Sequence, residues 1–214
     1  MFADRKAAGQ ELGRILKGRD LPDPVVLALP RGGVPVGFEV ARALGAPLDL
    51  VMVRKIGAPG HEELAMGAVV DGDHPQVAVN EDVARSFGLS REDVEARAAP
   101  GLAEIARRRG IYRSGRGTVP VAGRTAIVVD DGIATGATMR AALKAVRAQG
   151  PARLVLAVPV ASPDRLKQLE AEVDEAVCLE APAGFYAVGA HYRDFPQLED
   201  DEVIRLMDEA AGTK

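Results

Sequence analysis

The sequence predicts an α/β fold, in which a parallel sheet is covered by helices on both faces. Short apolar runs occur at residues 25–29, 48–53, 125–129 and 154–158, and the second of them contains one acid, Asp49. Such runs are typical of strands that are buried on both faces. Segments with helical periodicity separate them, and this alternation calls for parallel strands joined by helical crossovers.

The composition indicates one domain over residues 1–214. With 47% hydrophobic residues, the chain can bury one full core, and because only 4% are aromatic that core must be mainly aliphatic. The formal net charge of −4 makes nucleic-acid binding through overall charge an unfavoured function. A disulfide framework is excluded by the single cysteine, Cys178, which lies in an apolar run.

The same features indicate a cytoplasmic protein. The N-terminal residues lack the apolar region of a signal peptide, and no apolar run reaches the roughly 18 residues that a membrane span needs. We therefore expect no contact with membranes.

The first half of the chain begins with a helix over about 2–17, followed by the strand at 25–29. The turn Pro30-Arg31-Gly32-Gly33 then leads into a helix that Gly45 ends. The strand at 48–53 ends at two cations, Arg54 and Lys55, after which we expect a loop. Residues 65–70 and 76–79 are predicted to form a hairpin joined by the turn at 71–75.

A helical region follows this hairpin. A short helix begins near Asn80, and a capping box at Ser90 begins a longer one that runs towards Tyr112, with Pro100 kinking or splitting it. Residues 85–116 hold eight arginines against four acids. This segment is either a solvated helix face or an electropositive cover for a polyphosphate or a subunit contact.

The C-terminal part continues the alternation. Ser162 and Pro163 begin a helix, 177–179 is a further strand, and a helix covers about 200–209. We expect an insertion over about 57–120 and a small C-terminal hood over about 182–214.

The stretch from Thr125 to Arg140 predicts the ligand site. A buried strand ends in Asp130 and Asp131, and the turn Ala134-Thr135-Gly136-Ala137-Thr138 precedes a helix. The free N–H groups and the dipole at a helix start favour a phosphate. The two carboxylates suit a vicinal diol and can hold Mg²⁺ through water. A phosphate next to a diol describes a ribose 5-phosphate.

Residues 128–138 closely resemble the phosphoribosyl-pyrophosphate (PRPP) signature of type I phosphoribosyltransferases. The resemblance implies a phosphoribosyltransferase-like, Rossmann-like core. It assigns Asp130 and Asp131 to the ribose hydroxyls and to Mg²⁺, and the residues Ala134, Thr135, Gly136, Ala137 and Thr138 to the 5-phosphate.

The family also has a pyrophosphate-binding loop after its first core strand, sometimes with an unusual cis peptide. Arg31, Gly32 and Gly33 stand at that position, and Arg54 and Lys55 are similar to a basic pair near the pyrophosphate. A plain glycine turn and two surface cations are the respective alternatives. For the accepting base the candidates are Phe185, Tyr186, Tyr192 and Phe195, any of which could instead close the core.

The resemblance implies an Mg²⁺-dependent transfer of the phosphoribosyl group from PRPP to a nucleobase or related nitrogen heterocycle, with pyrophosphate released. A homodimer is compatible with this function. The alternative is a regulatory or binding protein that senses PRPP without transferring it. A phosphoacceptor domain is disfavoured, because the other strand ends offer Pro30, Arg54 and Pro159 rather than a further Asp.

Overall fold

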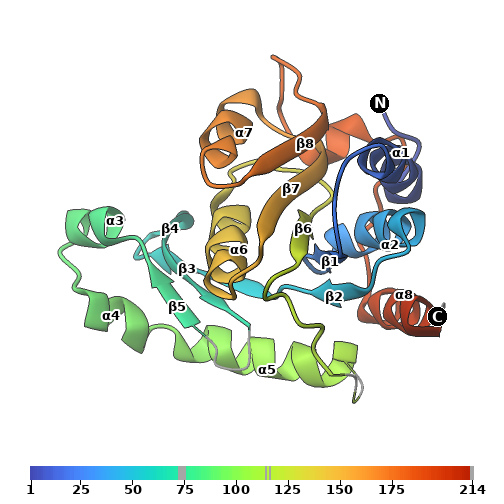
Figure 1. Ribbon diagram of the computed structural model, residues 1–214. Helices are drawn as coiled ribbons and strands as arrows, with labels where there is room; N and C mark the ends of the chain where they lie inside the picture. Colours follow the sequence, from blue (N-terminus) through green and yellow to red (C-terminus); the bar gives the residue numbers. More distant parts are fainter. Residues whose placement is uncertain (72–75, 114, 116, 213–214) are drawn as a thin grey trace.

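The computed structural model describes residues 1–71, 76–113, 115 and 117–212, and in this part of the chain the main sheet is parallel throughout (Figure 1). Its five strands lie in the order β2–β1–β6–β7–β8. They are β1 (Pro24–Ala28), β2 (Leu48–Leu50), β6 (Thr125–Val129), β7 (Arg153–Val160) and β8 (Glu175–Glu180). The predicted α/β class is confirmed.

Helices cover both faces of this sheet, and alternate strand residues serve the two faces. Val26 and Ala28 of β1 share a core with α1 (Arg5–Lys17), α2 (Gly33–Leu44) and α8 (Asp200–Gly212). Val25 and Leu27 point to the other side and pack with α6 (Ala137–Ala148) and α7 (Pro163–Glu170). Gly45 ends α2 with a φ of 63°, as predicted for a glycine stop.

A second sheet lies beside the first (Figure 1) and corrects one prediction. It is antiparallel, with β3 (Val53–Ala58), β4 (His61–Val70) and β5 (Gln76–Val79) in that order. Arg54 and Lys55 therefore lie inside β3 and not in a loop beyond a strand end, because pairing with β4 extends the chain there. Of the predicted turn at 71–75, residues 72–75 lie outside the described part.

Three helices follow the second sheet: α3 (Glu81–Ser86), α4 (Arg91–Ala96) and α5 (Ala99–Arg113). The capping box predicted at Ser90 is present, with Asp93 as its acid. The expected split near Pro100 is confirmed, because α4 ends before it and α5 begins at Ala99. Figure 1 shows α5 running along this sheet towards α8, which it contacts.

The C-terminal residues pack across the end of the main sheet. After β8 the chain forms the short 3₁₀ helix η1 (Val188–His191) and then α8. Phe2 pairs with Tyr192 in an isolated bridge, so the N-terminus contacts the segment that was predicted to be the hood. In the described residues no helix is both long enough and apolar enough to cross a membrane.

Candidate functional site

The carboxyl ends of β1 and β6 bring two of the predicted segments together. Ala28 pairs with Val129, so the turn at 30–33 and the acids at 130–131 leave the sheet side by side. A Cβ built on Gly33 would lie 2.7 Å from the carbonyl oxygen of Val129 and 2.9 Å from the Cα of Asp130. Only glycine allows this close approach. The peptide bond between Pro30 and Arg31 is cis.

The turn at 134–138 forms the start of α6. Gly136 occupies the N-cap position with a φ of 77°, and no side chain caps the helix. The N–H groups of the first turn of α6 therefore have no intrahelical partner. Ala134, Thr135 and Thr138 are all exposed. The turn is therefore open to solvent and presents N–H donors of the kind that bind anions.

A cavity of about 810 Å³ adjoins this turn. Thr135 and Ala137 line one side of it, together with Arg140 and Lys144 from α6. Residues of β4, β5 and α3 line the opposite side. The antiparallel sheet thus forms a wall next to the predicted phosphate position.

The two acids have different surroundings. Asp131 accepts a hydrogen bond of 2.8 Å from Nε of Arg5 through Oδ2, and its side chain is 14% exposed. Asp130 accepts a hydrogen bond of 2.9 Å from the backbone N–H of Asp131. Burial, and then the charge of Asp131, raise the pKa of Asp130 well above its ordinary value. Burial also raises the pKa of Asp131, against the opposing effect of Arg5.

Two of the predicted pyrophosphate-side cations, Arg31 and Arg54, are held by acids from other elements. Nη1 of Arg31 lies 3.6 Å from Asp200 and 3.8 Å from Glu199, at the start of α8. Nη2 of Arg54 lies 3.5 Å from Glu104 of α5. Lys55 is exposed on β3. The structure therefore directs Arg54 towards α5.

The aromatic residues of the hood differ greatly in exposure. Tyr186 is 91% exposed, whereas Tyr192 is 5% exposed. The hydroxyl of Tyr192 donates a 2.6 Å hydrogen bond to the backbone carbonyl of Asp131. Phe185 stacks on His191, with ring centroids 5.5 Å apart. Because Tyr192 is buried and its hydroxyl is bonded to the backbone of Asp131, direct stacking of its ring on a base is disfavoured.

Arg5 is the site residue that the sequence analysis missed. It lies on the buried face of α1, in line with Ala8 and Leu12 at spacings of three and seven residues. An arginine on the apolar face of a helix needs buried partners. That periodicity was the available signal.

The arginines at 85–116 are mostly paired with acids, as far as the structure describes them. Glu104 bonds Arg107 and Arg108, Arg91 pairs with Glu81 and Glu95, Arg85 with Asp82, and Arg109 with Asp71. Arg113, whose side chain is not described, and Arg116 fall outside this comparison. The observed pairing favours the solvated helix face over an electropositive cover.

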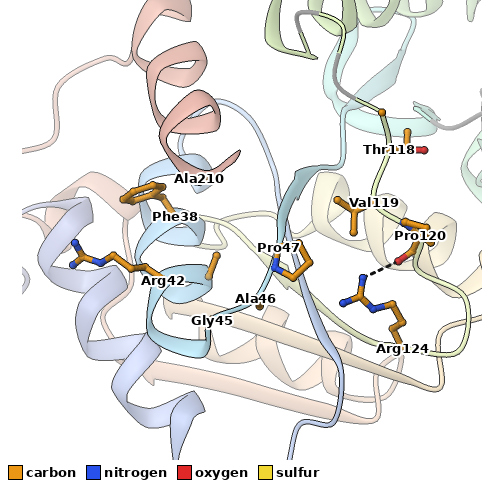
Figure 2. Close-up of a pocket in the computed structure, with 12 residues that line it drawn as sticks. Phe38, Arg42, Gly45, Ala46, Pro47, Thr118, Val119, Pro120, Arg124 and Ala210 are labelled. Atoms are coloured by element: carbon orange, nitrogen blue, oxygen red, sulfur yellow. Dashed lines mark hydrogen bonds between the residues drawn. The ribbon is translucent and has the colours of Figure 1, made fainter. Parts of the chain in front are cut away.

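Another cavity, of about 650 Å³, is lined by none of the residues predicted for the site (Figure 2). Pro47 and Arg124, which precede β2 and β6, line it, so it opens at the amino ends of the strands. Arg124 is already bonded there to the carbonyl of Pro120 and to Asp23. Ligands of parallel sheets bind at the carboxyl ends, and the candidate site is therefore the opposite edge.

No group of three or more His, Cys, Asp or Glu suited to a metal ion occurs among the described residues. The carboxylates of Asp130 and Asp131 are nevertheless hard oxygen donors, which fit Mg²⁺. A Mg²⁺ ion here would need most of its ligands from substrate phosphates and water.

The acids and the turn before α6 thus lie at the carboxyl edge of a parallel sheet, which is where such sheets bind ligands. Comparison with known proteins agrees. The model of the phosphoribosyl transferase domain family matches residues 2–192, and this chain belongs to that family. Its sheet and flanking helices have the type I phosphoribosyltransferase fold.

Two similar proteins extend this comparison. The Mycobacterium tuberculosis H37Rv protein named "Putative phosphoribosyl transferase Rv0571c" is 46% identical over 210 residues, which are 98% of this chain and 47% of that protein. The chain thus spans about half the length of this curated relative. The crystal structure of TT1426 from Thermus thermophilus has 44% identity, a TM-score of 0.88, and 99% of both chains covered.

Proposed function

We propose that this domain is an Mg²⁺-dependent phosphoribosyltransferase that binds PRPP and transfers its 5-phosphoribosyl group to a nitrogen base, releasing pyrophosphate. The observation that carries the proposal is the contact between the turn at 30–33 and the acids at 130–131, next to an open anion-binding turn. Three chemical groups of PRPP, the 5-phosphate, the diol and the pyrophosphate, then each have a complementary partner.

The 5-phosphate binds at the start of α6. The N–H groups that follow Gly136 donate to it, and the hydroxyls of Thr135 and Thr138 add side-chain donors. Asp130 and Asp131 accept hydrogen bonds from the ribose hydroxyls. These charge-assisted bonds fix the sugar ring relative to the pyrophosphate loop.

The pyrophosphate binds at the turn holding Gly32 and Gly33, beside Arg31. Arg31 must exchange its partners Glu199 and Asp200 for the pyrophosphate oxygens. Arg54 must likewise exchange its partner Glu104 for the pyrophosphate oxygens, and Lys55 is the remaining cation that we propose for this group. Bound Mg²⁺ supplies charge neutralisation of the leaving pyrophosphate. The protein needs no nucleophile of its own, because orientation and charge stabilisation carry such a transfer.

The base is placed by the hood. Phe185 and the exposed Tyr186 are the side chains that we propose for it, and Tyr192 contributes through its bond to Asp131. A PRPP-sensing role without transfer is the remaining alternative.

The test is to incubate the protein with PRPP, Mg²⁺ and a panel of purine, pyrimidine and other nitrogen bases, and to measure pyrophosphate release. We expect base-dependent release with at least one acceptor. Measurable PRPP binding without turnover on any base would refute the transferase and favour the sensor. Absence of PRPP binding would refute both.

A further inference from the structure

Arg5 is a buried cation at the start of α1, only 8% exposed. Taking a guanidinium out of water is costly unless its donors are satisfied. The side chain therefore needs specific partners, and the identity of those partners shows what it does.

All three recorded contacts of Arg5 lead to the candidate site and the hood. Its Nε donates to Oδ2 of Asp131 at 2.8 Å, and its Nη1 donates to the carbonyl of Pro196 at 2.8 Å. The guanidinium carbon lies 3.7 Å from the centroid of the Phe195 ring. A planar guanidinium can make such a fork and a stacking contact at once, which an ammonium cannot.

Asp131 is also held at its backbone. The hydroxyl of Tyr192 donates to its carbonyl at 2.6 Å, and the ring of Tyr192 lies 4.9 Å from that of Phe195. Tyr192 therefore holds the backbone of Asp131 directly. Phe195 acts on its carboxylate only indirectly, by packing against Arg5. The other carboxylate oxygen, Oδ1, forms no hydrogen bond with the residues that the structure describes.

The helix that carries Arg5 is itself fixed. Asp4 caps it by accepting a 2.7 Å hydrogen bond from the N–H of Ala7. At Gly9 the helix packs so closely on α2 that a Cβ there would lie 2.8 Å from the carbonyl oxygen of Val36. Arg5 is therefore anchored on a rigid support.

We propose that Arg5 is a positioning residue for the ribose site. It holds one oxygen of Asp131 so that the other faces the sugar diol, and with Tyr192 and Phe195 it makes the placement of that carboxylate depend on the packing of the hood. This inference rests on the proposed function, because the diol is that of PRPP.

The test uses Arg5→Lys and Arg5→Gln, with Arg14→Lys and Arg14→Gln as matched controls. Arg14 lies on the same helix and is exposed. The affinities for PRPP, ribose 5-phosphate and its 2-deoxy and 3-deoxy analogues are measured with Mg²⁺, alongside thermal unfolding. A loosened fold weakens all these ligands alike. A misplaced Asp131 reduces only the preference for the sugar that has both hydroxyls.

We expect Arg5→Lys to weaken PRPP binding roughly tenfold, with a larger loss in Arg5→Gln, since a charge-assisted hydrogen bond is disturbed. In the wild type, the ratio of the affinity for ribose 5-phosphate to that for its deoxy analogues should exceed one. In both Arg5 variants this ratio should fall towards one. The Arg14 variants should keep both values. In an Asp131→Asn background, Arg5→Lys should weaken PRPP binding no further.

An unchanged preference in folded Arg5→Lys protein would overturn the proposal and leave Arg5 a purely structural residue. If both Arg5 variants fail to fold, Tyr192→Phe provides the test, because it removes only the hydroxyl that bonds Asp131. A reduced preference of Tyr192→Phe for ribose 5-phosphate over the deoxy analogues supports the proposal. An unchanged preference overturns it. A wild type that binds none of these ligands refutes the proposed function as well, whereas PRPP binding with an unchanged preference in the variants refutes only this inference.

Discussion

The carboxylate of Asp131 lies against the backbone of Gly32. A Cβ built on Gly32 would be 2.2 Å from Oδ2 and 2.6 Å from Cγ of Asp131, distances at which atoms overlap. Gly32 belongs to the proposed pyrophosphate loop and Asp131 to the proposed diol site. The two parts of the proposed site are therefore in direct contact, and a side chain on Gly32 would displace the Asp131 carboxylate.

The first prediction concerns this contact. Gly32→Ala should force the carboxylate of Asp131 or the loop to move, which weakens PRPP binding by at least tenfold and lowers the free energy of unfolding by about 1–3 kcal/mol, as overpacking does. Calorimetric titration with PRPP and chemical denaturation measure the two effects.

The matched control is Gly110→Ala in α5, where a Cβ would meet no atom within 4 Å. Alanine there should stabilise the helix by about 0.5–1 kcal/mol and leave PRPP binding unaltered. A Gly32→Ala protein that binds PRPP as the wild type does would show that this contact is unimportant for the site.

The second prediction separates the two acids. Asp130 is partly buried, and desolvation raises its pKa well above the ordinary value, so its ionised form costs stability. A group whose pKa is raised in the folded state stabilises the fold fully when the pH is below its unfolded-state pKa, here near 3.8. This stabilisation is lost as the pH rises through the folded-state pKa. Asp130→Asn should therefore gain stability relative to the wild type as the pH rises above about 4.

The same variant should bind PRPP more weakly, by about 1.5–3 kcal/mol, because a charge-assisted hydrogen bond is lost. Asp131→Asn should weaken PRPP binding too but should also destabilise the fold, since it leaves Arg5 without its carboxylate. Denaturation over a pH series, with PRPP titrations at pH 7, measures these effects. Asp164→Asn, an exposed acid on α7, is the control. Equal stability changes in the two site variants would contradict this view.

Much of the site could be predicted because its signals are local. An apolar run, two acids and a glycine turn in Thr125–Arg140 specify a strand end and a helix start without any knowledge of the rest of the fold. The turn at Gly32 is similarly local. Parallel pairing then brings these segments to one edge, as the alternation of strands and helices indicated.

The rest depends on contacts that the local pattern does not contain. Arg5 and Asp131 are 126 positions apart, and only the buried periodicity of α1 hinted at the pair. The placement of Arg54 failed for a different reason. The stretch at 48–53, apolar apart from Asp49, was predicted as one strand, but β2 ends at Leu50, and pairing with β4 makes Val53–Ala58 a separate strand.

The third prediction concerns Glu104, which accepts hydrogen bonds from Arg107 and Arg108 of α5. Hydrogen bonds from Arg107 and then from Arg108 lower the pKa of Glu104 from 4.5 to about 2. A lowered pKa stabilises the fold above the unfolded-state value, and the contribution is lost as the pH falls through the folded-state pKa. Glu104→Gln should cost up to about 1 kcal/mol at pH 7, since the pairs are partly solvated, and the difference should shrink between pH 4.5 and 2.

Denaturant unfolding of the wild type and Glu104→Gln over that pH range measures the effect. Glu11→Gln on α1 serves as the control, because Glu11 is exposed and forms no ion pair within the described part of the chain. A difference that stays constant with pH would show that these hydrogen bonds do not stabilise the charged carboxylate.

The last prediction concerns the link between the insertion and the C-terminal helix. Tyr112 of α5 is fully buried, and its hydroxyl donates a 2.5 Å hydrogen bond to Asp200 at the start of α8. Burial and then this hydrogen bond raise the pKa of Tyr112 to about 12, so the hydroxyl remains a donor at neutral pH. Asp200 in turn lies 3.6 Å from Arg31.

Tyr112→Phe keeps the ring and removes only the hydroxyl. It should lower the free energy of unfolding by about 1–2 kcal/mol, because a hydrogen bond to a charged group is lost. Asp200 should then interact more strongly with Arg31, which makes release of Arg31 to the pyrophosphate harder. Tyr186→Phe, at a 91% exposed position, should not change stability. A Tyr112→Phe protein as stable as the wild type would mean that water replaces the lost donor at Asp200 and that the insertion is held to α8 by apolar contact alone.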